Sequence, residues 1–103
     1  MGLSIHPAVA DDLAEAAEYY LEADPELPKR LRGDTREAVR AVGAFPYIGR
    51  TVFEDYRQIA LRVFPYLVIY RVTPGAVRIL AVLHAHRDPA SIELVLKERE
   101  RRS

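Results

Sequence analysis

The segment that most restricts the fold of this 103-residue chain is residues 77–83, in which every side chain except that of Arg78 is apolar. A strand without polar alternation is buried on both faces, so we expect this one to lie inside a sheet. Residues 66–72, rich in β-branched and aromatic side chains, come before it, and Pro74 and Gly75 suit the centre of a type II turn. These features predict a β-hairpin. We expect a short N-terminal strand, residues 4–6, to pair with the free side of residues 77–83.

Two segments with helical periodicity lie ahead of the hairpin. From Pro7 onward apolar residues recur on one helical face, and the predicted inward residues are Val9, Leu13, Ala16, Ala17, Tyr20 and Leu21. Two prolines within residues 24–28 end this helix. A second helix is predicted from about Pro28 to Ala44, with four inward residues, Leu31, Thr35, Ala38 and Val42. Together the two segments predict an antiparallel helical hairpin.

The segments between the second helix and the β-hairpin are less regular. Residues 45–50 are predicted to be a loop, because proline and glycine interrupt them. Residues 56–63 are predicted to be a strand with one buried face, since Ile59, Leu61 and Val63 alternate with Gln58, Ala60 and Arg62. This alternation directs the side chain of Arg62 away from the core.

Asp88 and Pro89 suit the cap and first position of a short final helix, whose charged tail, residues 97–102, is expected to fray. The tyrosines at positions 19, 20, 66 and 70 are expected to be packing residues with hydrated hydroxyl groups. The overall prediction is one α+β domain, residues 1–103. In it the helical hairpin packs on one face of a small, mainly antiparallel sheet.

Composition excludes several kinds of site. The chain has no cysteine, so it has no disulfide, thiolate metal site or cysteine nucleophile. The acids Asp11, Asp12 and Glu15 are expected to form a solvated helix face, and we predict no metal and no cofactor. The N-terminus lacks the pattern of a signal peptide, and no apolar run approaches the roughly 20 residues of a membrane span. We therefore expect a cytoplasmic protein that does not bind membranes.

Charge is divided unevenly along the chain. All fifteen basic residues lie beyond residue 28, whereas residues 1–28 contain seven of the fifteen acids. Between Arg50 and Arg87 there are six arginines, no lysine and only two acids. Either these arginines pair with the acidic first helix, or they form a basic face for an anionic partner. The composition leaves both interpretations open.

Several segments, in this order, resemble the plasmid-stabilisation branch of the RelE/ParE toxins. They are residues 6–8, 15–17, 19–20, 45–46, 49–50, 61–66, 69–72, 77, 79–84 and 87–89, which read HPA, EAA, YY, FP, GR, LRVFPY, IYRV, V, ILAVLH and RDP. The resemblance implies the toxin of a type II toxin–antitoxin system, with the α+β fold expected above. It also implies a cognate antitoxin that neutralises the toxin.

The resemblance leaves two targets open, because RelE-like members cut messenger RNA on the ribosome and ParE-like members inhibit DNA gyrase. The lysines of the RelE-like site align with Gln58 and Ala60, and an arginine of that site aligns with Leu67. No tyrosine follows Tyr70. These departures favour a ParE-like gyrase inhibitor that acts by binding, without turnover. The expected target-binding residues are Arg50, Arg57, Arg62, Arg71 and Arg87.

The alternative is a metal-free, ribosome-dependent mRNA endonuclease, with the ribosome and its message as partners. RNA cleavage needs proton-transfer groups and cations for the charged phosphorane. Its catalytic residues would be Arg62, His84, His86 and Arg87. For His84 a hydrogen-bonded structural role is favoured over catalysis, and for Arg87 an anchoring role at the start of the final helix has the same weight as binding. A third hypothesis is an inactive toxin that persists as a binding module.

Overall fold

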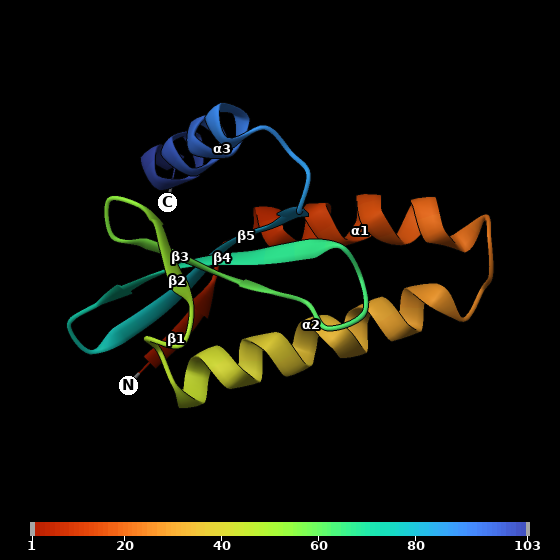
Figure 1. The fold of residues 1–103 in the computed structure, drawn as a ribbon, viewed down its shortest axis with the longest axis horizontal. Coiled ribbons are helices and arrows are strands. Elements are labelled where there is room, and N and C mark those ends of the chain that lie inside the picture. The colour runs from red at the N-terminus through yellow and green to blue at the C-terminus, as the bar shows by residue number, and fades with distance from the viewer. Residues whose placement is uncertain (1, 103) are drawn as a thin grey trace.

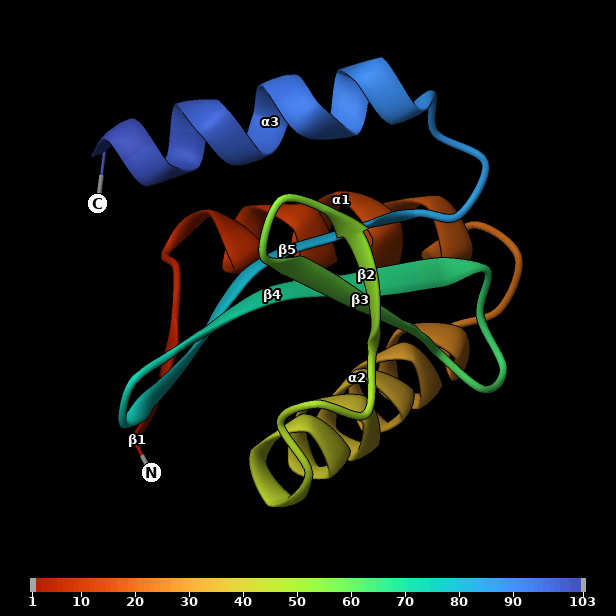
Figure 2. The same ribbon diagram turned by 60° about the vertical axis from the view of Figure 1, so that its left-hand side comes forward.

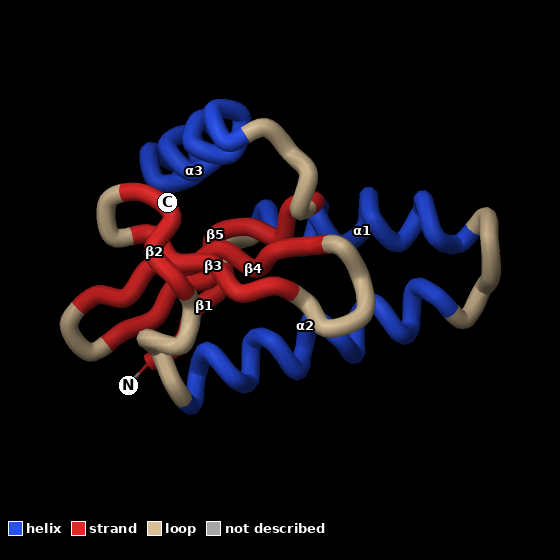
Figure 3. Tube along the Cα trace, viewed as in Figure 1, coloured by secondary structure: helices blue, strands red, loops and turns tan. Residues whose placement is uncertain are grey.

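The computed structural model describes residues 2–102. Its elements are β1 (Gly2–Ile5), α1 (Ala8–Leu21), α2 (Leu27–Ala44), β2 (Arg50–Phe53), β3 (Tyr56–Ala60), β4 (Tyr66–Thr73), β5 (Ala76–His84) and α3 (Pro89–Arg102). The strands form one sheet in the order β1-β5-β4-β3-β2. Only β1 pairs in parallel, and the other neighbours are antiparallel (Figures 1 and 3). The predicted α+β class and mainly antiparallel sheet are confirmed.

The β4–β5 hairpin is the centre of the sheet, as residues 77–83 predicted. Gly75 in its turn has φ +76°, the left-handed conformation that a type II turn requires at this position. β5 lies between β4 and β1, and Ile79, Leu80 and Ala81 have no exposed surface. The sequence therefore identified the central strand and both of its neighbours.

The α1–α2 hairpin covers one face of the sheet (Figure 2). All four residues expected to face inward from α2 are buried, and they pack with sheet residues such as Val68, Tyr70 and Ile79. Two expectations for α1 are wrong. Leu21 is 52% exposed because it is the last residue of the helix, beside the connection to α2. Tyr19 is exposed as well, beside Tyr20 rather than against the sheet.

α3 covers the opposite face, where Ile92 and Leu96 pack against Leu67, Ile69 and Leu80. The expectation that its charged tail frays is wrong, since the helix continues to Arg102. Polar contacts from Arg99 and Glu100 hold this end to the rest of the domain. The sheet is consequently covered by helices on both faces.

Two predicted boundaries next to β3 are corrected. Arg50 begins a strand, β2, rather than ending a loop; this edge strand has four residues and an irregular register, too short for an alternating pattern. β3 ends at Ala60, so Arg62 and Val63 lie in the β3–β4 loop. The apparent alternation continued past the strand because Leu61 of the loop is itself buried in the α1–α2 core.

Among residues 2–102, every helix is too short or too polar to span a membrane.

Candidate functional site

The five predicted target-binding arginines do not form one basic face of the sheet. Residues directly opposite each other on paired strands share a face. Arg50 lies opposite Gln58, which lies opposite Ile69, on the face that α3 covers. Arg57 lies opposite Tyr70, on the α1–α2 face. The interpretation in which these arginines form one basic face is therefore wrong.

Arg50 and Arg57 are held by their own local structure. The Arg57 guanidinium donates to the carbonyl of Gly49 at 2.7 Å and lies 5.0 Å from the centre of the Tyr47 ring. Arg50 reaches the side-chain oxygen of Gln58 at 3.0 Å in the amide orientation that satisfies both groups. These contacts fix the β2–β3 edge and leave less of each guanidinium for a partner.

Arg71 belongs to an ion-pair network at one end of the sheet. It contacts Asp55 at 2.8 Å and Glu100 of α3 at 2.9 Å. The side-chain hydrogen bond with Asp55 is the main cause that raises the pKa of Arg71. Arg71 thus joins the β2–β3 turn to α3, which is a structural role.

Arg62 differs from the other four predicted target-binding arginines. It is exposed in the β3–β4 loop, and its side chain has no hydrogen bond or ion pair with any residue between 2 and 102. Its backbone N–H, in contrast, donates to the carboxylate of Asp34 at 3.1 Å. The loop backbone is fixed while the guanidinium remains available to a partner.

Three of the four candidate catalytic residues surround one open pocket of about 690 Å³ between α1 and the end of β5. Its lining is Asp12, Glu15, Ala16, Tyr19, Tyr20, Pro65, Tyr66, Val82, Leu83, His84, His86 and Arg87. Arg62 is not part of this lining. The predicted cluster of Arg62 with both histidines is therefore only partly formed.

Local hydrogen bonds account for most polar groups at this pocket. His84 Nδ1 accepts from the backbone N–H of His86 at 3.1 Å, so the neutral ring carries its proton on Nε2. Arg87 Nε donates to Ser91 Oγ at 2.9 Å, and Asp88 accepts from the Ser91 N–H. The predicted cap and the anchoring role of Arg87 are confirmed.

Two tyrosines that line the pocket, Tyr20 and Tyr66, are poor bases. Burial raises the pKa of Tyr66, with smaller contributions from Tyr20 and Glu15, and burial also raises the pKa of Tyr20. Both phenols therefore keep their protons near neutral pH. They can donate hydrogen bonds or pack against a ligand.

Tyr70 departs from the expected hydrated hydroxyl. The residue is fully buried, and its hydroxyl accepts a hydrogen bond from the Gly49 N–H at 2.8 Å. A Cβ at position 49 would lie 2.6 Å from that oxygen and 2.7 Å from the Gln58 carbonyl. Glycine is needed here because the loop approaches the sheet so closely. The Gly49-Arg50 pair in the sequence signalled a loop but not this contact.

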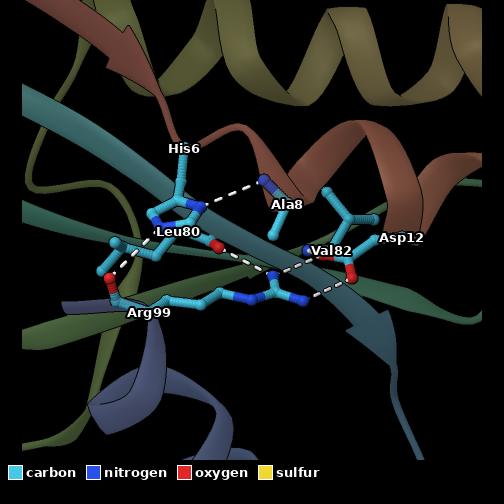
Figure 4. A network of polar contacts seen from close by, with 6 residues as sticks. All are labelled: His6, Ala8, Asp12, Leu80, Val82 and Arg99. Atoms are coloured by element: carbon cyan, nitrogen blue, oxygen red, sulfur yellow. Dashed lines mark hydrogen bonds and ion pairs between the residues drawn. The ribbon is translucent and has the colours of Figure 1, made fainter. Parts of the chain in front are cut away.

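Sequence reasoning missed a buried ion pair between α1 and α3 (Figure 4). The two Arg99 guanidinium nitrogens each lie 2.6 Å from an Asp12 carboxylate oxygen. Arg99 also donates to the Leu80 carbonyl at 2.8 Å, and Asp12 accepts from the Val82 N–H at 2.9 Å. Asp12 is therefore not part of a solvated acidic face. The residues are 87 positions apart, which no local pattern reveals.

This pair lies where β1 stops, since β1 accompanies β5 only as far as Ile79. Beyond that point Asp12 and Arg99 satisfy the β5 edge groups that a longer β1 would have bonded. His6 reinforces the junction: its Nδ1 accepts from the Ala8 N–H at 3.0 Å, and its Nε2 lies 3.1 Å from the Arg99 carbonyl (Figure 4). The C-terminal helix is thus fastened to both N-terminal elements.

Comparisons with known proteins agree on one family. The family model described as the ParE toxin of the type II toxin–antitoxin system parDE matches residues 3–89. Two curated proteins called Toxin ParE2, from Mycobacterium tuberculosis strains CDC 1551 / Oshkosh and ATCC 25618 / H37Rv, are each 39% identical over 98 residues, covering 94% of this chain and 93% of theirs. A solved structure described as a chromosomal ParDE system from P. aeruginosa matches with a TM-score of 0.74 at 21% identity, covering 84% of this chain and 97% of that chain. The last match concerns the fold.

Proposed function

Because this chain belongs to the ParE toxin family and is a toxin of a type II toxin–antitoxin system, we propose that it inhibits DNA gyrase by binding, without turnover. A cognate antitoxin neutralises it by covering the surface that gyrase would contact. Both encounters take place in the cytoplasm. Arg62 in the β3–β4 loop makes the central contact. Arg87 lies at the same end of the sheet, where the Ala85 N–H donates to the Pro65 carbonyl at 2.8 Å.

The observation that carries this proposal is the chemistry of the sheet positions that would hold cations in a RelE-like nuclease. Gln58 and Leu67 are buried, and Leu67 packs in the apolar cluster under α3. Ala60 lies opposite Leu67 on the same face. All three of these positions hold neutral side chains, so none of them offers a cation for a phosphorane. An exposed and unpaired Arg62 suits a protein–protein contact, where arginine is a frequent anchor.

A supercoiling assay with purified gyrase tests the proposal. We expect the protein to inhibit supercoiling and the purified antitoxin encoded beside it to reverse the inhibition. Arg62→Ala is expected to weaken inhibition by about tenfold or more, the usual scale for a central interface arginine. Arg40→Ala is the matched control, because Arg40 is also exposed but lies on α2 in a local pair with Glu37. Growth arrest by a protein that leaves gyrase unaffected would contradict the proposal.

One observation favours an mRNA endonuclease as the second candidate: His84, His86 and Arg87 line one pocket with Glu15. A translating-ribosome assay run in parallel distinguishes the two. Cleavage of the message within translated codons would support the nuclease if the His84→Ala, His86→Ala double variant no longer cleaves it. If the protein neither inhibits gyrase nor cleaves message, an inactive binding module is favoured.

A further inference from the structure

The β3–β4 loop, residues 61–65, is held by one carboxylate from another element. Asp34 of α2 accepts hydrogen bonds from three consecutive backbone N–H groups: Arg62 at 3.1 Å, Val63 at 2.8 Å and Phe64 at 3.0 Å. Figure 1 shows this loop curving beside α2. Hydrogen bonds to an ionised acceptor are roughly twice as strong as those between neutral groups. Asp34 therefore restrains the loop backbone at three successive positions.

The loop is also anchored from inside. Leu61 and Phe64 are both buried in the α1–α2 core, and the Phe64 ring lies 4.9 Å from that of Tyr20. The Leu61 N–H donates to the Tyr66 carbonyl at 2.9 Å. Between these anchors Val63 is 75% exposed. The loop exposes an apolar side chain beside Arg62 although its backbone is fixed.

The Asp34 carboxylate accepts hydrogen bonds from backbone N–H groups and does not pair with a cation of the described chain. No ion pair joins it to Arg62 or to another basic group in the part of the chain that the structure describes. A direct Asp34–Arg62 pair would have occupied the guanidinium. The observed arrangement instead uses the carboxylate to shape the loop and leaves the adjacent cation free. This separation of roles suits a partner surface with a carboxylate beside a small apolar contact.

We propose that Asp34 is a positioning residue for the target contact, holding the β3–β4 loop in the conformation that presents Arg62 and Val63 to the partner. The inference rests on the proposed function, because it assigns Arg62 to the target interface. A loop already ordered before binding avoids the conformational entropy that a mobile one loses on binding. Removing that order at three residues is expected to weaken inhibition by about tenfold to a hundredfold.

The test is a double-mutant cycle with Asp34→Asn, Arg62→Ala and the combined variant. Asparagine keeps the shape of the side chain but has only one acceptor oxygen, and its NH₂ group would face the loop N–H donors. We expect each single variant to weaken gyrase inhibition. The combined variant is expected to lose clearly less than the product of the two single losses, because the Arg62 contact that Asp34 positions is already absent. Glu37→Gln is the control, since it removes the same charge from the same helix without touching the loop. It is expected to inhibit like the wild type.

If Asp34→Asn inhibits gyrase as strongly as the wild type while Arg62→Ala is defective, the inference is overturned. So would losses that multiply in the combined variant, because Asp34 would then act independently of Arg62. If the wild type leaves gyrase active, the proposed function fails, and the same cycle is read from growth arrest, where the same non-additive pattern supports positioning and an additive one rejects it.

Hydrogen exchange separates positioning from a general loss of stability. In Asp34→Asn the amides of Arg62, Val63 and Phe64 are expected to exchange faster, whereas those of β5 keep their protection. Unchanged loop amides would reject the role. If Asp34→Asn does not fold, Asp34→Glu keeps the charge and displaces the carboxylate by one methylene. It is then expected to show the same weaker inhibition and faster loop exchange.

Discussion

At the scale of single residues, the Asp12–Arg99 pair joins the first helix to the last helix of the described chain. Both side chains are nearly removed from solvent, with exposures of 9% and 15%. Each charge also bonds to a β5 backbone group. Removing one partner leaves the other charge buried and one β5 edge group unsatisfied, which typically costs about 3–5 kcal/mol. Removing both avoids the uncompensated charge.

We therefore predict that Asp12→Ala and Arg99→Ala each lower the free energy of unfolding by about 3 kcal/mol or more. The combined variant is expected to lose clearly less than the sum of the two, because the partners are coupled. Urea denaturation of the four proteins measures this. Arg101→Ala is the control: Arg101 lies in the same helix in an exposed pair with Glu98, and its loss is expected to cost about 0.5 kcal/mol or less. Additive losses would show that the two charges do not stabilise each other.

What the sequence revealed of individual residues depended on distance along the chain. The Asp88 cap and the Pro74-Gly75 turn were predictable because their partners lie within three residues. Asp12 and Arg99, and Asp34 and its loop, were not predictable, since helical periodicity states which face a residue occupies but not which segment approaches that face. For this reason Arg62 was correctly expected to be exposed, but it was assigned to the wrong element.

At the scale of elements, α3 is stabilised by an apolar stripe that packs on the sheet and by polar contacts near its C-terminal end. The stripe of Ile92 and Leu96 was predictable from helical spacing. The persistence of its charged end was not, because it depends on Arg99 and Glu100 reaching partners on other elements. β2 was missed for a related reason: a four-residue edge strand has too little alternation to be recognised.

Leu94 and Leu96 allow the contribution of α3 to be measured within a single turn. Leu96 is fully buried against the sheet, whereas Leu94 is 69% exposed. Leu96→Ala is expected to lower the free energy of unfolding by about 2–5 kcal/mol, through lost burial and the resulting cavity. Leu94→Ala is expected to change it by about 0.5 kcal/mol or less. Similar effects of the two variants in urea denaturation would show that α3 does not dock on the sheet in solution.

At the scale of the whole molecule, the order of the sheet was predictable and the distribution of charge on it was not. A nearly continuous apolar strand requires neighbours on both sides and cover on both faces, and β5 has both. The interpretation of one basic face was wrong because the strand register places neighbouring arginines on opposite faces, as with Arg57 and Arg71. The single exposed arginine of the β3–β4 loop then carries more of the proposed function than the cluster did.

Burial of phenols throughout the molecule predicts how stability depends on alkaline pH. Burial is the main cause that raises the pKa of Tyr20, Tyr56, Tyr66 and Tyr70 above the ordinary value of 10.0. Below pH 10 both the folded and the unfolded chain hold these protons, so the contribution to stability is complete. As the pH rises past 10, the unfolded chain releases them first, and the free energy of unfolding falls until the folded tyrosines ionise as well.

The urea midpoint is accordingly expected to fall as the pH rises above about 10, the unperturbed tyrosine value. Lys97, whose hydrogen bond with Glu93 raises its pKa, acts in the same direction, so the informative quantity is the difference between variants. Tyr70→Phe removes the most deeply buried phenol and should give a shallower fall, although it lowers stability at every pH by leaving the Gly49 N–H unbonded. Equal slopes for Tyr70→Phe and the wild type would mean that the Tyr70 proton is not held more tightly by the fold.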